Sequence, residues 1–238
     1  MWAGNITAMT TARLTALLLL LAAPALGAEP AGRMPAPPRP VGYPFAAIHN
    51  TEELLARLMC GWCAGLPGCP RYNGSHVHAG VDLRATLGEA VCAIMDGVVD
   101  PRSDTPHSGY GPGWTMGQVM IVRTTLPPTP DDPAGVSFLI VYGHTQKHTV
   151  KGGDAVRAGQ QLCEIGPWPD REGGPHLHVT VRLGDLPRYG WGTPTLQGHP
   201  VREGAEVVAC EEDVVRLGYR EPLAALWGIM PAVTISLP

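Results

Sequence analysis

The chain has 238 residues, with 17 Lys and Arg against 21 Asp and Glu, and its formal net charge at pH 7 is −4. This balance argues against a nucleic-acid-binding protein, because such proteins usually carry a basic patch. Once the N-terminal segments described next are set aside, about 190 residues remain, a length that suits one domain with elaborations rather than two.

Residues 1–28 have the pattern of a secretory signal peptide. A short lead with Arg13 precedes an apolar run at 14–21, and small residues follow near Ala25 and Ala28, where cleavage is expected. The apolar run is short for a bilayer span, and a retained membrane anchor is the alternative interpretation. Cleavage would remove Arg13 and change the net charge from −4 to −5. We therefore expect an exported protein, periplasmic or extracellular, without a membrane span in the mature chain.

Residues 29–44 are rich in proline and lack a periodic apolar pattern, so we expect an extended linker there. The next segment, 45–70, is expected to hold a short helix and half of the cysteines. Asn50 is the expected N-cap of this helix, and Glu53 stands where its side chain reaches back to the cap. The apolar stripe of the helix consists of Leu54, Leu55, Leu58 and Met59. The helix is expected to end at Cys60.

The six cysteines are Cys60, Cys63, Cys69, Cys92, Cys163 and Cys210. All lie in the part expected to be exported, where an even number favours disulfides, although six cysteines allow 15 pairings and the sequence does not choose among them. The alternative for Cys60-Gly61-Trp62-Cys63 is a redox or metal motif. Neither a second C-x-x-C nor a thioredoxin-like βαβ pattern accompanies it, so structural disulfides are preferred.

Between residues 72 and 184 the sequence consists of short β-branched runs separated by glycine and proline. No long amphipathic helix interrupts these runs, which favours an antiparallel, mostly β domain. The expected strands lie at 90–94, 97–99, 119–123, 136–142, 156, 161–165 and 177–183.

His176 and His178 begin the last of these runs. Side chains alternate along a strand, so both imidazoles are expected on one face. Upstream, His78 and Asp82 lie four residues apart at the start of another β-like run. Catalytic zinc sites typically have three protein ligands and one position left for water. His78, Asp82 and one histidine of the later pair would supply those three ligands.

A further histidine, His144, follows the apolar run 138–141. A polar residue that closes a buried strand can present its side chain to a cleft, although taken alone His144 is more simply an ordinary surface or hydrogen-bonded histidine.

The motifs His78-x-x-x-Asp82, Tyr142-x-His144 and His176-x-His178, in this order, resemble those of the lysostaphin-type (LytM-like) zinc endopeptidases that cut peptidoglycan peptides. The matching glycine-bounded runs are 88–93 with 96–99, 153–160, and Gly174-Pro175. The resemblance covers roughly half of the chain, from 72 to 182. A lone H-x-H is weak evidence, but five chemically required residues in this order are a strong signal.

The resemblance implies that His78, Asp82 and His178 bind zinc, and that His144 and His176 act in catalysis beside the metal. Tyr72 stands where some family members place a tyrosine whose hydroxyl faces the site; the alternative is a packed or rim tyrosine. The implied fold is mostly β, a compact antiparallel β-sheet domain with a substrate groove (LytM-like, duplicated hybrid motif) at 71–184, preceded by the short helix and followed by a C-terminal extension at 185–238.

The resemblance also places Cys92 and Cys163 in the same small sheet, which implies a bridge between them. The other two bridges would then join Cys60, Cys63, Cys69 and Cys210. His76 is an alternative ligand to His78, but the H-x-G-x-D spacing favours His78. The remaining histidines fit no ligand spacing; they are His49, His107, His148 and His199.

The expected function is that of an exported zinc metalloendopeptidase whose substrates are peptidoglycan peptides. No H-E-x-x-H helix supplies a glutamate base, so the histidine pair His144 and His176 must handle the protons. Two alternatives stay open. One is a non-catalytic regulator of wall hydrolases, against which the five filled positions argue, and the other is a secreted zinc protease acting on general protein substrates. The bond cut, the oligomeric state and the role of the extension are left open.

Overall fold

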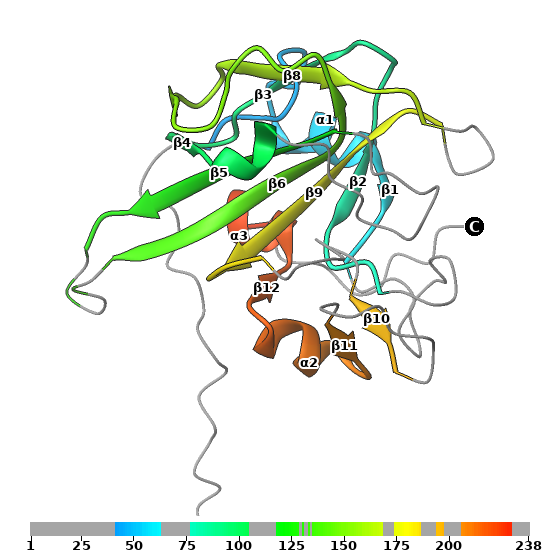
Figure 1. Cartoon of the computed structure of the whole chain (residues 1–238). Coiled ribbons are helices and arrows are strands. Elements are labelled where there is room, and N and C mark those ends of the chain that lie inside the picture. Colours follow the sequence, from blue (N-terminus) through cyan, green and yellow to red (C-terminus); the bar gives the residue numbers. More distant parts are fainter. Residues whose placement is uncertain are drawn as a thin grey trace, which may run out of the picture. The chain divides into compact units, whose positions relative to one another are not determined.

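The structure, a computed structural model, describes residues 41–62, 77–104, 118–128, 130, 133, 135–168, 174–186, 194–197 and 206–229 (Figure 1). All of these belong to one unit of the chain, Met34–Pro238. The predicted signal peptide, most of the predicted linker and Tyr72 lie outside the described residues. Among the helices that are described, none has the length and apolar character needed to cross a membrane.

A large sheet of ten strands dominates the fold, and every strand pair in it is antiparallel. The predicted mostly β fold is therefore confirmed. Along the main path the strands are β1 (Leu58–Cys60), β2 (Val81–Arg84), β9 (His176–Leu183), β6 (Val136–Gln146), β5 (Gln118–Leu126), β4 (Gly97–Val99) and β7 (Ala155–Val156). Off this path, β8 (Gln161–Ile165) pairs with β6 and β3 (Ala90–Cys92), and a 3-10 turn, η1 (Pro101–Asp104), follows β4.

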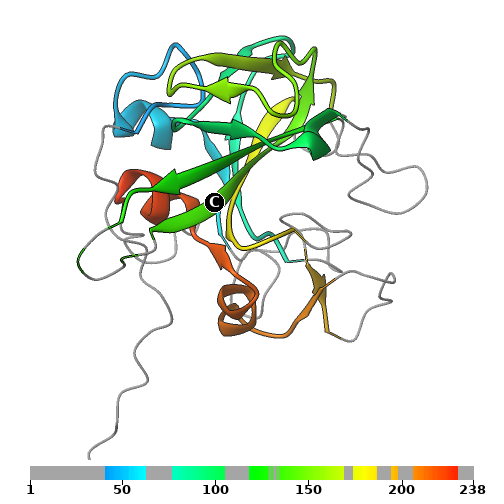
Figure 2. The same cartoon turned by 60° about the vertical axis from the view of Figure 1, so that its left-hand side comes forward.

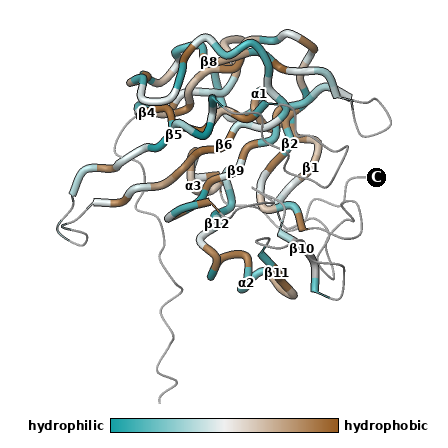
Figure 3. The backbone as a smooth tube through the Cα atoms, in the orientation of Figure 1, coloured by the Kyte–Doolittle hydropathy of each residue, from teal (hydrophilic) through white to brown (hydrophobic). Residues whose placement is uncertain are grey.

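The core forms on both faces of the long central strands β5 and β6 and on one face of β9, because residues of a strand alternate between its faces. In Figure 3 hydrophobic residues recur along β6 and β9. The larger cluster includes Met120, Val122, Ile140, Tyr142 and Val179. The smaller cluster, on intervening residues, consists of Val119, Ile121, Leu139, Val141 and Leu186. Both faces of these strands are buried, which stabilises the β-branched runs as strands.

The N-terminal helix α1 (Thr51–Ala56) is shorter than predicted. Its cap is confirmed, since the Asn50 side chain accepts a hydrogen bond from the backbone N–H of Glu53 at 2.9 Å. The prediction that the helix continues to Cys60 is wrong. Residues Leu58–Cys60 instead form β1, which pairs with β2 and so satisfies their backbone groups in the sheet.

The C-terminal extension contributes β10 (Thr195–Leu196), β11 (Val207–Val208), α2 (Glu211–Arg216), β12 (Tyr219–Arg220) and α3 (Pro222–Trp227). Strands β10 and β11 form a separate parallel pair, whereas β12 joins the main sheet beside β9. In Figures 1 and 2, α2 and β11 lie near β12, away from β3 and β8.

A partly buried ion pair joins this extension to β9. Arg182 donates to both carboxylate oxygens of Glu206, at 2.6 and 2.7 Å, and the Tyr219 hydroxyl donates to the same carboxylate at 3.0 Å. The Arg182 guanidinium also lies 4.5 Å from the centroid of the Tyr219 ring. Arg182 itself is buried, so loss of the Glu206 carboxylate would leave a buried guanidinium without this ionic partner. These contacts therefore attach the extension to β9, the strand that carries His176 and His178.

The cysteines do not pair as expected. Four described cysteines are free, namely Cys60, Cys92, Cys163 and Cys210. The expected bridge between Cys92 and Cys163 is wrong, and Cys60 and Cys210 do not take part in the other two expected bridges; the last two cysteines, Cys63 and Cys69, lie outside the described residues. Strands β3 and β8 do pair, but the register sets Cys163 opposite Val91 and Cys92 opposite Gln161. Burial raises the pKa of both core thiols, which keeps them neutral.

Candidate metal centre

Strand register brings three predicted ligands to one point. Asp82 on β2 lies directly opposite His178 on β9, and cross-strand partners project from the same face of a sheet. His78 precedes β2 and reaches the same place. The Nε2 of His78 lies 3.1 Å from Asp82 Oδ1 and 2.8 Å from His178 Nδ1, and His178 Nδ1 lies 3.0 Å from Asp82 Oδ1. All three side chains are buried.

Hydrogen bonds on the outer side of each ring decide which nitrogen faces this triangle. The Thr180 hydroxyl donates to the carbonyl of Ala79 at 3.1 Å, so its oxygen accepts from His178 Nε2 at 2.8 Å. The Nδ1 of His78 lies 3.0 Å from the carbonyl of Gly61, which can only accept. In their neutral forms, His78 Nε2 and His178 Nδ1 therefore both turn lone pairs toward the Asp82 carboxylate.

Three acceptor atoms about 3 Å apart in a buried place need a positive charge between them. Their separations of 2.8–3.1 Å are somewhat shorter than the edge of a tetrahedral zinc site, where ligand atoms at about 2.0–2.2 Å from the metal lie about 3.3–3.6 Å apart, so a small outward shift would accommodate the ion. The pKa shifts of the two groups also indicate a place that favours positive charge beside the Asp82 carboxylate. Burial acts against charge on His78 and on Asp82, but their attraction prevails, so the pKa of His78 is raised and that of Asp82 is lowered. Burial lowers the pKa of His178, which favours its neutral, ligating form.

Gly80 explains the glycine inside the H-x-G-x-D spacing. A Cβ at this position would lie 2.5 Å from the carbonyl oxygen of Val179, 2.8 Å from Thr180 Oγ1 and 2.9 Å from His178 Cε1. Only glycine lets the segment carrying His78 lie this close to β9. The backbone next to His78 is also covered by the C-terminal extension, in a cluster of Val77, Ala79, Val208, Val214 and Tyr219.

The other two predicted histidines lie beside this triangle. The rings of His144 and His176 have centroids 4.5 Å apart, and His144 lies 6.1 Å from the ring of His178. His176 Nε2 is 3.8 Å from Asp82 Oδ1. The Nδ1 of His176 faces the carbonyl of Gly174 at 2.7 Å, so this nitrogen is the donor and Nε2 is the acceptor in the neutral ring. Both side chains are buried.

The structure thus brings together five of the six predicted site residues, and the sixth, Tyr72, lies outside the described residues, as does the alternative ligand His76. Two other histidines are described. His49 is exposed, and His148 lies 3.1 Å from the Thr145 hydroxyl. Neither joins the triangle.

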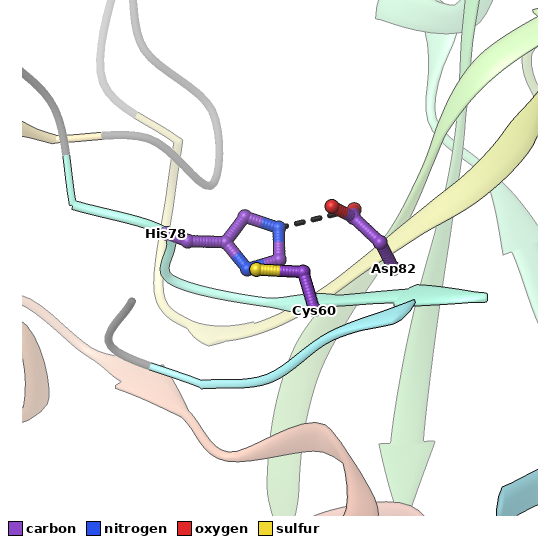
Figure 4. Close-up of side chains that lie close together, drawn as sticks. All are labelled: Cys60, His78 and Asp82. Carbon is purple, nitrogen blue, oxygen red and sulfur yellow. Dashed lines mark hydrogen bonds and ion pairs between the residues drawn. The ribbon is translucent and has the colours of Figure 1, made fainter. Parts of the chain in front are cut away.

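Cys60 is a neighbour of the site that the sequence interpretation did not include. It lies opposite Asp82 in the pairing of β1 with β2. Its sulfur, one ring nitrogen of His78 and one carboxylate oxygen of Asp82 all lie within 4.8 Å of one another, and Figure 4 shows the thiol beside the His78 ring. Cys60 is therefore an alternative ligand to His178. The C-x-x-C spacing was its only signal, since its contact with Asp82 depends on the β1–β2 register.

Trp168 was also missed. It follows β8, and its ring centroid lies 3.9 Å from that of His144 and 5.8 Å from that of His176. Nothing in the local sequence relates this tryptophan to either histidine, because the contact arises from the pairing of β6 with β8.

Comparison with known proteins gives a family match over residues 76–189, to peptidase family M23. This range contains all five of the clustered histidine and aspartate residues. No match was found among the curated proteins.

Solved structures with some likeness include the catalytic domain of the antimicrobial peptidase lysostaphin from Staphylococcus simulans, at 25% identity, covering 59% of this chain and 91% of that chain, with a TM-score of 0.40. A zinc-containing peptidase from Vibrio cholerae has 22% identity over 63% of this chain and 41% of that chain, with a TM-score of 0.40. A variant catalytic domain of the prophage-encoded M23 protein EnpA from Enterococcus faecalis has 24% identity, coverages of 54% and 82%, and a TM-score of 0.38. These TM-scores are low, so the likeness to peptidase family M23 rests on the match over 76–189.

Proposed function

We propose that this chain, whose residues 76–189 match peptidase family M23, is an exported zinc metalloendopeptidase that hydrolyses peptide bonds of bacterial peptidoglycan. One observation carries the proposal. Three buried acceptor atoms, from His78, Asp82 and His178, converge within 3.1 Å of one another, beside two further histidines.

These three residues would hold the zinc, with the Gly61 carbonyl and the Thr180 hydroxyl orienting the two imidazoles from outside. Such outer partners fix the tautomer and ring orientation of a ligating histidine. Bound zinc supplies Lewis acidity, which polarises a scissile carbonyl and lowers the pKa of a coordinated water. A site with three protein ligands leaves one position for that water.

Proton handling falls to His176 and His144. The Nε2 of His176 is an acceptor, because its Nδ1 hydrogen is engaged by Gly174, and this nitrogen faces the Asp82 carboxylate. It is thus placed to take the proton of the attacking water. His144 packs edge-on against His176 and, when protonated, stabilises the developing oxyanion.

Export and wall substrate are parts of the same proposal. The signal-like residues 1–28 support export, and the resemblance of the His78, His144 and His176 motifs to wall endopeptidases supports a peptidoglycan substrate. The two other functions considered are a non-catalytic wall regulator and a protease of general substrates.

The test is to incubate the purified mature chain, from residue 29 onward, with peptidoglycan and to identify released fragments by mass spectrometry. Casein serves as the general protein substrate, and samples with a chelator and with Asp82→Asn serve as controls. New peptide termini in peptidoglycan that both controls abolish are expected. Cleavage of casein alone would indicate a general protease, and no cleavage of either substrate by zinc-loaded protein would contradict an enzymatic role.

A further inference from the structure

Trp168 packs against His144. The two ring centroids are 3.9 Å apart, with the rings tilted by 41°. His144 is only 2% exposed, whereas Trp168 is half-buried, so the indole is one of the groups that shield the imidazole from solvent. Aromatic rings at this separation attract one another beyond the effect of buried area.

The backbone of His144 is held in an unfavourable conformation. Its φ is +62°, in the left-handed region that costs a residue with a Cβ free energy and persists only where the surroundings enforce it. Gly166, two residues before Trp168, donates its backbone N–H to the carbonyl of His144 at 2.7 Å. A Cβ on Gly166 would lie 3.0 Å from the carbonyl oxygen of Thr145 and 3.1 Å from that of His144. Glycine therefore allows the backbone at position 166 to lie this close to the backbone of His144 and Thr145.

His144 is therefore held at both its backbone and its ring by the segment that follows β8. On the other side, His176 packs edge-on against the His144 ring with centroids 4.5 Å apart. The imidazole lies between the indole of Trp168 and the imidazole of His176, and each of them limits its rotation.

From this arrangement we infer that Trp168 is a positioning residue, which holds the His144 ring against His176 in the orientation that peptide hydrolysis requires. This inference rests on the proposed function for its catalytic consequence. The shielding of His144 by Trp168 is independent of that function and can be measured in an inactive protein.

Three variants separate the contributions of the indole. Trp168→Phe keeps an aromatic face, Trp168→Leu keeps apolar bulk without the ring, and Trp168→Ala removes the cover. Thermal unfolding and zinc content should match those of the wild type, because the rings that Trp168 packs against, those of His144 and His176, are not among the three proposed ligands.

The first measurement is the rate at which diethyl pyrocarbonate acylates His144 in the zinc-loaded mature chain, followed by peptide mass spectrometry. His49, which is exposed, is the internal control. We expect the rate at His144 to rise severalfold in Trp168→Ala, to rise less in Trp168→Leu and to stay near the wild-type value in Trp168→Phe. The rate at His49 should be the same in all four proteins.

The second measurement is turnover on a peptidoglycan substrate. Misplacing a catalytic group by about 1 Å can cost on the order of 10²-fold, so kcat of Trp168→Ala should fall by that order with little change in KM. Trp168→Phe should restore most of the rate. A loss confined to KM would instead identify Trp168 as a substrate contact and overturn the positioning role.

The outcomes distinguish this inference from the proposed function. If the rate at His144 is unchanged in Trp168→Ala, the shielding is refuted whether or not the enzyme is active. If His144 becomes reactive while kcat is kept, positioning by Trp168 is refuted although hydrolysis stands. A wild type that hydrolyses no peptide but shows the expected acylation pattern would refute the proposed function and leave the hold of Trp168 on His144 in place.

Discussion

Replacing Asp82 with asparagine tests the metal centre most directly. The substitution keeps the shape of the side chain and removes the negative charge from between His78 Nε2, at 3.1 Å, and His178 Nδ1, at 3.0 Å. Partners that only orient a ligand cost 10–100-fold in metal affinity when lost. A ligand itself should cost more, so we expect zinc affinity to fall by at least about 10²-fold, or about 2.7 kcal/mol.

The assay is competition for zinc against a chromophoric chelator, with zinc per chain measured after dialysis. Asp100→Asn is the matched control. Asp100 is as buried as Asp82, with exposed fractions of 7% and 4%, and it too has cationic partners, Arg102 and Arg123. Its carboxylate is not part of the proposed centre, so the control should keep wild-type zinc affinity.

A result in which Asp82→Asn binds zinc as tightly as the wild type would remove Asp82 from the ligand set. If Asp100→Asn weakens binding equally, the loss in Asp82→Asn reflects general damage to the fold, and the argument from the His78–Asp82–His178 triangle fails.

The remaining predictions use the same preparations. His144→Ala and His176→Ala should each keep one zinc per chain but lose about 10²–10⁴-fold in turnover, and near wild-type turnover in either would refute its role. Cys60→Ser should keep wild-type zinc affinity if His178 is the third ligand, whereas a loss like that of Asp82→Asn would show that Cys60 ligates. The hydrogen bond from Arg102 lowers the pKa of Asp100 to about 2, so Asp100 stabilises the fold above its unfolded pKa of about 3.9 and this stabilisation is lost as pH falls toward 2. Urea unfolding of metal-free wild type and Asp100→Asn should therefore show a stability difference that shrinks in acid, and a constant difference would contradict this.

The strands of the domain could be predicted because their signal is local. The runs at 97–99 and 161–165 have the bounds that the structure gives them, since short runs with Val or Ile between turn residues favour extended backbone. The segment after Asn50 shows the limit of such patterns. Leu58 and Met59 continue a helical stripe, but pairing with β2 removes them from the helix, and that pairing joins residues more than twenty positions apart.

The C-terminal extension was not predicted beyond its existence, because its strands have two residues each and carry no periodic pattern. Its position is set by contacts with distant residues. Arg182 on β9 meets Glu206 and Tyr219, and no spacing within the sequence indicates that contact.

The same difference between local and distant information divides the site. His176 and His178 share a face because of strand geometry, and His78 and Asp82 are joined by a spacing whose central glycine the packing against β9 requires. Cys60 and Trp168 reach the same place only through the β1–β2 and β6–β8 pairings. The residues proposed to perform the chemistry can thus be identified from the sequence. Their neighbours Cys60 and Trp168 can be identified only once the strand pairing is known.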